Sequence, residues 1–253
     1  MIELKSLSVG YGKTEILKNA NASFEKGKLT VLVGVNGCGK TTLLKTVAGI
    51  LPPLNGSISA DGSELSCLSQ KDRARILSYL PQGRPLPDMT VGELVLHGRF
   101  PHLSFPRVYS DSDKSIAKEK MKQIGIEDLC DFHLSTLSGG MRQKAYIAMA
   151  LASESEYLLL DEPTTYLDIA HQIELMKILK ALAESGKGVV AVLHDLSLAM
   201  EYADELAVIS NGSVRIQASS SLRLCSDMIG TVFGVDVIQT EADGRRFWRF
   251  IKK

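Results

Sequence analysis

Short apolar runs separated by amphipathic stretches dominate the pattern of this chain. Leu29 to Val33, Leu158 to Leu160 and Val189 to Leu193 are apolar or nearly so throughout. Such runs are typical of parallel strands that helices cover on both faces. Between the last two runs, Ala170 to Glu184 has the spacing of an amphipathic helix. Its inward face is expected to carry Leu175, Ile178, Leu179 and Leu182. The pattern predicts an α/β core around a parallel sheet.

Shorter runs at the N-terminus predict further strands. Ile2 to Val9 and Ala20 to Phe24 alternate enough to form strands on either side of a turn around Gly10 to Lys13. Ser57 to Ala60 and Ile76 to Leu80 also have strand character. We therefore expect an N-terminal antiparallel β subdomain beside the core.

From residue 82 to residue 155 the pattern becomes helical. Thr90 to Leu96 begins with a capping box, and Asp113 to Ile124 is amphipathic, with Ala117 and Met121 on its apolar face. Arg142 to Ala152 predicts a more buried helix. The simplest interpretation is an inserted α-helical subdomain over residues 82–155, with residues 1–81 and 156–217 forming the α/β core.

The last part of the chain predicts a C-terminal extension over residues 218–253 of one domain, 1–253. Asn211-Gly212 is a hairpin turn between two apolar runs and closes the core. A short helix near Asp227 to Phe233 and a strand near Arg246 to Ile251 follow. The sequence predicts no role for this extension.

Composition and charge limit the classes of function. The chain has 253 residues, and its 29 Lys and Arg balance 29 Asp and Glu, so no basic footprint indicates a nucleic-acid partner. No apolar run approaches the roughly 20 residues that span a bilayer, and the N-terminus lacks a secretory pattern. The four cysteines are scattered without metal-like pairing. We expect a soluble intracellular protein.

The most informative motif follows the first apolar run of the core. Gly34-Val35-Asn36-Gly37-Cys38-Gly39-Lys40-Thr41 fits a glycine, four residues and then Gly-Lys-Ser/Thr, and Thr42 to Ala48 predicts the helix after it. Glycines let backbone N–H groups approach a triphosphate, and the helix N-terminus favours the anion. Lys40 would add charge near the β- and γ-phosphates, and Thr41 a hydroxyl for Mg²⁺. The motif predicts a site for ATP with Mg²⁺.

A pair of carboxylates follows the second apolar run. Asp161 and Glu162 stand at the end of a predicted strand, before Pro163. We expect this strand to be adjacent to the strand of the phosphate loop, where Asp161 can hold Mg²⁺ through water. Glu162 could accept a proton from the attacking water or orient it. The alternative is a strand that ends in polar residues without chemistry.

A third motif lies in the helical insert. Leu137-Ser138-Gly139-Gly140-Met141-Arg142-Gln143 precedes a helix, and here the chain resembles the ATP-binding-cassette superfamily, whose signature is Leu-Ser-Gly-Gly-Gln. The resemblance implies a homodimer packed head to tail. Ser138, Gly139 and Gly140 would then bind the ATP held by the other copy, with Ser138 and Gly140 at its γ-phosphate. Met141 departs from the usual Gln, and we expect altered fine-tuning rather than loss of activity.

The resemblance also assigns roles to four further residues. Tyr11 would stack on adenine, and Gln82 would sense Mg²⁺ and the γ-phosphate. Asp168 would link the two sites across the dimer, and His194 would lie near the γ-phosphate as the switch histidine. Simpler roles stay open for each: a turn tyrosine, a polar loop residue, a helix N-cap and a histidine at a strand end. The implied catalytic residues are Lys40, Gln82, Glu162 and His194, and the implied Mg²⁺ residues are Thr41, Gln82 and Asp161.

Two longer stretches narrow the resemblance to one branch. Gly98 to His102 and Asp161 to Glu174 are similar to the ATPases of iron-chelate, haem and cobalamin importers. That branch implies two membrane permease subunits above the homodimer and a substrate-binding protein outside the cell. The ATPase would sit at the cytoplasmic face of the membrane as a peripheral subunit, with no nucleic acid among its partners. A ferric siderophore or another iron chelate is the favoured cargo, with haem and cobalamin as alternatives.

Other classes that use the same cassette fit less well. DNA-maintenance ATPases place long coiled coils inside the cassette, but residues 82–137 are too short and lack sustained heptads. Ribosome-associated factors carry two tandem cassettes, whereas this chain has one phosphate loop. Within transport, an exporter or an importer of another cargo stays open.

Overall fold

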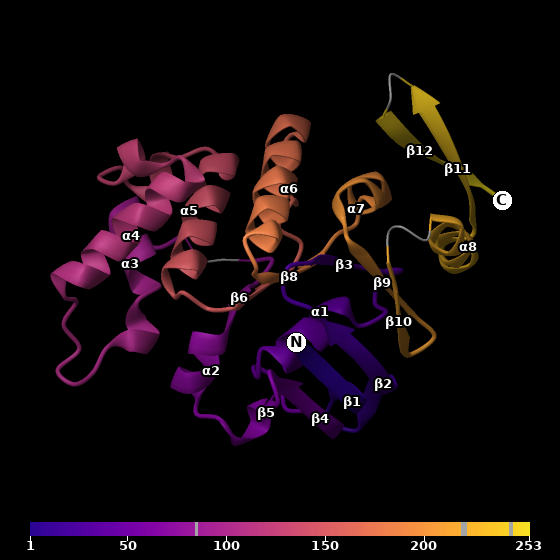
Figure 1. Ribbon diagram of the computed structural model, residues 1–253, viewed down its shortest axis with the longest axis horizontal. Helices are drawn as coiled ribbons and strands as arrows, with labels where there is room; N and C mark the ends of the chain where they lie inside the picture. The colour runs from indigo at the N-terminus through magenta and orange to yellow at the C-terminus, as the bar shows by residue number, and fades with distance from the viewer. Residues whose placement is uncertain (84–85, 219–221, 243–244) are drawn as a thin grey trace.

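A six-stranded sheet forms the centre of the molecule (Figure 1), which a computed structural model describes over residues 1–83, 86–218, 222–242 and 245–253. The strands in sheet order are β10 (Ser213–Ala218), β9 (Glu205–Ser210), β3 (Leu29–Val33), β8 (Gly188–Val192), β7 (Tyr157–Leu160) and β6 (Leu77–Leu80). Neighbours from β9 to β6 are parallel, and β10 pairs antiparallel with β9 at one edge. The carboxyl ends of β3, β8 and β7 therefore meet at one side of the sheet.

The strand that carries Asp161 is not the neighbour of the phosphate-loop strand, so the expectation of adjacent strands is wrong. Strand β8 lies between β3 and β7. Thr41 still reaches Asp161, because it lies in the first turn of helix α1 (Lys40–Val47) and extends beyond the end of β8. A continuous apolar run identifies a buried strand, but it does not give the order of strands in the sheet.

The two faces of the central sheet are covered by different elements. On one face, Leu32, Leu159 and Val190 pack with α1 and the N-terminal strands. On the other face, residues such as Val31 and Leu160 pack with helices α6 (Ile169–Glu184) and α7 (Leu196–Tyr202) and with the helical subdomain. Figure 1 shows α6 and α7 on one side of the sheet and α1 on the other. Alternate residues of each strand thus serve two separate cores.

The N-terminal strands form the expected antiparallel sheet, with longer strands than predicted. Its order is β2 (Thr14–Phe24), β1 (Ile2–Tyr11), β4 (Asn55–Ala60) and β5 (Ser63–Glu64). Strand β1 continues to Tyr11, and β2 begins at Thr14 because Tyr11 pairs with Thr14 and Gly10 with Glu15. Tyr11, Thr14 and Glu15 are exposed, so the apolar pattern carries no signal for this part of the hairpin.

Three helices build the inserted subdomain: α3 (Val91–His97), α4 (Asp111–Ile124) and α5 (Gly139–Ala152). The predicted capping box of Thr90 and Glu93 is confirmed, and Ala117, Met121 and Ile124 are buried as predicted. Among the described residues from 86 to 155 there is no strand, apart from one isolated bridge between Thr90 and His133. Helix α2 (Gln70–Ile76) was not predicted, and it includes Ile76, which was expected to begin a strand.

The C-terminal extension comprises α8 (Leu222–Phe233) and a hairpin of β11 (Val235–Ala242) and β12 (Arg245–Lys252). The hairpin lies beside α7 (Figure 1). Its partly buried Trp248 and Phe250 pack against the core that contains Val31 and Leu160. The apolar pattern did not predict β11, α7 or the early start of α8. The side chain of Cys225 lies outside the described part of the structure. Within that part, no helix combines the length and the apolar character needed to cross a bilayer.

Arg99 joins three parts of the helical subdomain through a buried ion pair. Its Nε donates to Asp113 Oδ1 at 2.9 Å, at the start of α4, and its guanidinium donates to Ala152 O at 2.8 Å, at the end of α5. It also pairs with Glu154 at 2.6 Å. Gly98 must be glycine, since an added Cβ would lie 2.0 Å from Met149 O. Gly98 and Arg99 therefore have structural roles in this subdomain.

We predict that Asp113→Asn destabilises the protein by about 2–3 kcal/mol at pH 7, because buried Arg99 loses its buried carboxylate partner and keeps only the half-exposed Glu154. Hydrogen bonds from Ser110 and Arg99 lower the pKa of Asp113 from 3.8 to about 2. The contribution is therefore complete above the unfolded pKa and is lost as the pH falls from 3.8 toward 2. Urea unfolding measures the difference, which should shrink below about pH 4. In the exposed pair of Lys114 and Asp111, Asp111→Asn should change stability by less than about 1 kcal/mol.

Candidate nucleotide site

The phosphate loop turns between β3 and α1 through backbone conformations that require glycine. Gly37 and Gly39 have φ angles of 77° and 104°, in the left-handed region. Gly34 has no space for a side chain, since an added Cβ would lie 2.6 Å from Ile209 O and 2.7 Å from Cys38 Sγ. Lys40 Nζ donates to the carbonyls of Gly34 at 2.8 Å and Val35 at 3.2 Å. The loop thus surrounds its own lysine ammonium, which can turn toward an anion.

Asp161 lies beneath the first turn of α1 and is held by hydroxyl groups. Thr41 Oγ1 donates to Asp161 Oδ1 at 2.9 Å, and Tyr79 Oη donates to Oδ2 at 3.2 Å. Asp161 is 1% exposed, and this burial raises its pKa. A hydroxyl and a carboxylate at one point are hard oxygen donors, the kind that Mg²⁺ prefers. The donor set fits a magnesium ion beside the phosphate loop.

Glu162 lies at the centre of a polar cluster whose residues follow the carboxyl ends of strands β6, β7 and β8. His194, just after β8, places Nε2 2.6 Å from Glu162 Oε1. Gln82, just after β6, donates through Nε2 to Glu162 Oε2, and Thr165 Oγ1 donates to the same oxygen at 3.2 Å. The backbone of Glu162 has a φ of 50°, an uncommon conformation for a non-glycine residue. The cluster fixes the carboxylate where it could act on a water molecule.

An open hollow of about 460 Å³ lies between the phosphate loop and the cluster around Glu162. Its lining residues are Ile16, Asn36, Gly37, Gly39, Lys40, Thr41, Thr42, Gln82, Glu162 and His194. All of them except Ile16 were expected from the sequence, and Ile16 was missed because β2 begins earlier than the apolar pattern indicates. Tyr11 lies at the end of β1 and is 51% exposed, so its aromatic face is free for stacking, although it does not line this hollow.

The signature motif lies at the N-terminus of α5, away from this hollow. Ser138 is the N-cap of α5, and its Oγ accepts from Met141 N at 3.3 Å. Among the described residues that line the hollow at the phosphate loop, none belongs to 138–140. Gly139 instead borders a separate hollow of about 200 Å³ with Gln82, Thr165 and Tyr166. The chain therefore does not place its own signature on its own phosphate loop.

Asp168 has the capping role that the sequence left open. Its Oδ1 accepts from the backbone N of His171 at 2.9 Å, at the start of α6. This backbone bond, together with the contact to the imidazole, lowers the pKa of Asp168. Its carboxylate is therefore charged at neutral pH. A cap on α6 and a role at a dimer interface are compatible, because the Asp168 side chain is 66% exposed.

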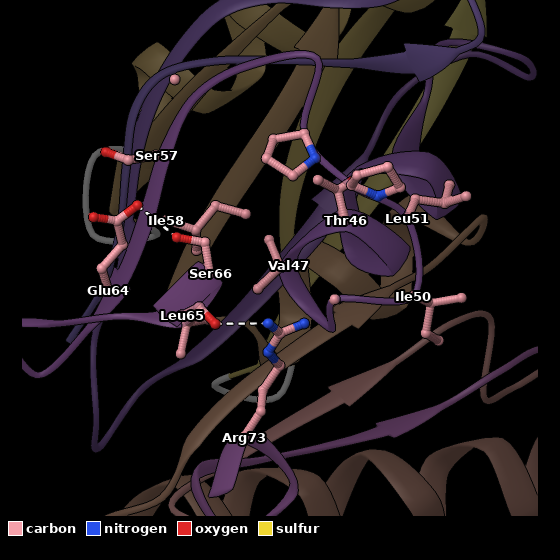
Figure 2. Close-up of a pocket in the computed structure, with 14 residues that line it drawn as sticks. Thr46, Val47, Ile50, Leu51, Ser57, Ile58, Glu64, Leu65, Ser66 and Arg73 are labelled. Atoms are coloured by element: carbon pink, nitrogen blue, oxygen red, sulfur yellow. Dashed lines mark hydrogen bonds between the residues drawn. The ribbon is translucent and has the colours of Figure 1, made fainter. Parts of the chain in front are cut away.

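Another pocket, of about 350 Å³, lies at the C-terminal end of α1 and is lined by none of the predicted site residues. Figure 2 shows Arg73 reaching between the end of α1 and strand β4, with its guanidinium donating to Leu65 O at 2.6 Å. At the rim, Ser66 donates to Glu64 at 2.6 Å (Figure 2). Arg73 also packs on Gly49, where an added Cβ would lie 1.3 Å from Nη1. Arg73 thus has a structural use here, since it fills the space between α1 and α2.

Comparisons with known proteins agree with this geometry. The chain matches the family described as ABC transporter over residues 17–165, and it belongs to that family. It is 40% identical to the achromobactin transport ATP-binding protein of Dickeya dadantii, covering 93% of this chain and 88% of that one. It is 39% identical to the ferric enterobactin transport ATP-binding protein of Escherichia coli, covering 91% and 86%.

Solved structures extend the likeness to the whole fold. The chain matches a structure described as an inward-facing conformation of a metal-chelate type ABC transporter with a TM-score of 0.86 and 26% identity, over 99% of this chain and 96% of that one. It also matches a dimeric bacterial ABC transporter cassette with a TM-score of 0.74 and 28% identity, over 87% and 99%. The cassette fold predicted from the motifs is confirmed.

We predict that Gly34→Ala weakens ATP binding by about 10-fold or more, because a methyl group meets Ile209 O and Cys38 Sγ and strains the loop. Equilibrium titration with a fluorescent ATP analogue measures the change. Gly83→Ala is the matched control, since its added Cβ meets nothing within 4 Å, and it should bind as wild type. Equal affinity of Gly34→Ala and wild type would contradict the tight approach described above.

We predict that Met141→Gln leaves the steady-state ATPase rate within about 2- to 3-fold of wild type. The backbone N–H of Met141 donates to Ser138 Oγ. Its partly buried side chain packs against the core on the α6 and α7 side of the central sheet. The substitution keeps the backbone bond. A large gain in rate would show that the family's usual glutamine makes a polar contact that this chain lacks.

Proposed function

We propose that this chain is the ATP-hydrolysing subunit of a membrane importer for a ferric siderophore or another iron chelate. The observation that carries the proposal is the convergence of Lys40, Thr41, Gln82, Glu162 and His194 on one hollow. The relatives named for achromobactin and ferric enterobactin transport support the cargo class, because the chain is similar to them over more than 90% of its length. Haem, cobalamin and other metal chelates are the alternative cargoes.

The phosphates of ATP would lie on the loop from Gly34 to Thr42, with the Lys40 ammonium at the β- and γ-phosphates. Thr41, Asp161 and Gln82 would hold Mg²⁺. When bound, Mg²⁺ neutralises charge on the phosphate oxygens. Tyr11, half exposed at the end of β1, would stack on the adenine.

The cluster around Glu162 would supply the chemistry of hydrolysis. The Glu162 carboxylate, which His194 Nε2 and Gln82 Nε2 hold in place before ATP binds, would accept a proton from the attacking water. Once ATP is bound, His194 could turn from Glu162 to the γ-phosphate, because its side chain is 47% exposed. The rest of catalysis is positioning and charge stabilisation.

The site would be completed by a second copy of the chain. Residues 138–140 do not line the hollow at their own phosphate loop, and their backbone N–H groups lie at the N-terminus of α5. A head-to-tail homodimer would bring Ser138, Gly139 and Gly140 of each copy onto the ATP of the other. The similarity to a dimeric cassette supports this arrangement. Asp168, exposed at the start of α6, would link the two sites.

The dimer would drive two permease subunits at the cytoplasmic face of the membrane, with a substrate-binding protein on the outer side. ATP binding would close the dimer, and hydrolysis would reopen it. Segments after Gln82 would carry this motion to the permeases. The ATPase would not contact the cargo, so selectivity would belong to the other subunits.

Co-reconstitution with the permease subunits in liposomes tests the whole proposal. We expect the permeases and the loaded binding protein to stimulate ATP hydrolysis, and labelled ferric siderophore to enter the vesicles in an ATP-dependent manner. Haem and cobalamin are tested in parallel to separate the alternative cargoes. Stimulation by DNA or ribosomes, with no response to permeases, would refute a transport role.

We predict that Glu162→Gln retains ATP binding and lowers kcat by about 10²- to 10⁴-fold, because the amide cannot accept the proton. Binding is measured with a fluorescent ATP analogue and turnover by phosphate release. Asp111→Asn, at an exposed residue that does not line the hollow, is the control and should retain wild-type turnover. Turnover near the wild-type rate in Glu162→Gln would remove Glu162 from the catalytic role.

A further inference from the structure

The imidazole of His171 bridges two motifs that lie in different parts of the chain. His171 is the third residue of α6, directly after the loop that contains Asp168. Its ring extends from the α/β core to the first turn of α5, where the signature begins. No role for this histidine follows from the sequence, because a solvated helix start accounts for it equally well.

One edge of the ring lies against Gly140. A Cβ added to Gly140 would lie 2.3 Å from His171 Cδ2 and 2.8 Å from Nε2. These contacts are shorter than any that real side chains make, so the ring occupies the space that a side chain at position 140 would need. The second glycine of the signature is thus required by His171, independently of any contact with nucleotide.

The opposite side of the ring is fixed by Asp168. His171 Nδ1 lies 2.8 Å from Asp168 Oδ1, and the backbone N of His171 donates to the same oxygen at 2.9 Å. Because a carboxylate only accepts, Nδ1 carries the hydrogen. One carboxylate oxygen therefore caps α6 and sets the orientation of the imidazole. The imidazole thus contacts Asp168 on one side and Gly140 on the other.

A second bridge joins the same two helices further along their length. Lys144 Nζ of α5 lies 2.7 Å from Glu174 Oε1 of α6. Lys144 follows Gly140 by four residues, and Glu174 follows His171 by three, so both bridges lie on the facing sides of the helices. Helix α5 is therefore tied to α6 at its first turn by a packed ring and one turn later by an ion pair.

We propose that His171 is a positioning residue that holds the signature at a fixed distance and orientation from the Asp168 loop, so that one copy presents both to the ATP of the other copy together. This inference rests on the proposed head-to-tail dimer. The ring does not touch the nucleotide; it acts through Gly140 and Asp168. Losing it would leave the phosphate loop of the same copy unchanged, because that loop lies at the carboxyl end of β3.

The test separates ATP binding by one copy from closure of two copies. In the Glu162→Gln background, ATP-dependent dimerisation is measured by analytical ultracentrifugation over a range of ATP concentrations. Binding of a fluorescent ATP analogue is measured at protein concentrations where the chain is monomeric. We expect His171→Ala to raise the ATP concentration for half-maximal dimerisation by about 10-fold while monomer binding stays unchanged.

Two further variants divide the contribution of the ring. His171→Asn keeps a donor for Asp168 and loses the edge on Gly140, whereas His171→Phe keeps a ring at Gly140 and loses the donor. Each should shift dimerisation less than His171→Ala, and with otherwise wild-type residues each should raise KM for ATP more than it lowers kcat. Lys177→Ala, an exposed position on α6, is the matched control and should behave as its parent.

The outcomes distinguish this inference from the function on which it rests. If Glu162→Gln dimerises with ATP and all three His171 variants do so at the same ATP concentration, the positioning role is wrong and the dimer stands. If Glu162→Gln itself does not dimerise with ATP, the composite site is wrong, and the inference falls with it. If His171→Ala melts at a lower temperature than its parent, the test rests on the Asn and Phe variants. The positioning role is then supported if they need more ATP to dimerise, and refuted if they need the same concentration as their parent.

Discussion

The hydrogen bond from Thr41 to buried Asp161 is the interaction on which the rest of the site depends. It ties the first turn of α1 to the end of β7 across the intervening strand β8. Because Glu162 follows Asp161 directly, the same bond sets the distance from the phosphate loop to the carboxylate proposed for catalysis. His194, at the end of the strand between, then has Glu162 within reach. The parallel register of β3, β8 and β7 makes this possible, since it brings their carboxyl ends to one edge.

The family, the cassette fold and most residues of the hollow could be predicted from the sequence, because each depends on local chemistry. A glycine-rich loop that ends in a lysine at a helix start is suited to binding phosphates, and the family prediction is confirmed. The strand before Asp161 was wrongly predicted to be adjacent to the phosphate-loop strand, since a buried apolar run looks the same at any place in a sheet. Helix α2 and strand β11 were missed because one is polar and the other half exposed. The roles of the site residues stay predictions.

The structural roles of His171 and Arg99 could not be predicted from the sequence. Both stand in stretches that resemble importer ATPases, and neither could be assigned a role from residue type alone. In the fold, Arg99 joins α4 to the end of α5, and His171 joins the start of α5 to α6. One residue thus holds the helical subdomain together, and the other connects it to the core. Their importance comes from contacts between residues far apart in the chain, which no local pattern reports.

The separation of the two cores by the central sheet has a mechanical consequence. Helix α1 packs in one core with the N-terminal strands, whereas α5 and α6 pack in the other. A tilt of the helical subdomain would therefore shear apolar contacts on one side of the sheet while the opposite side stays intact. The apolar contacts that hold α1 and the phosphate loop in place are thus separate from those that such a tilt would strain.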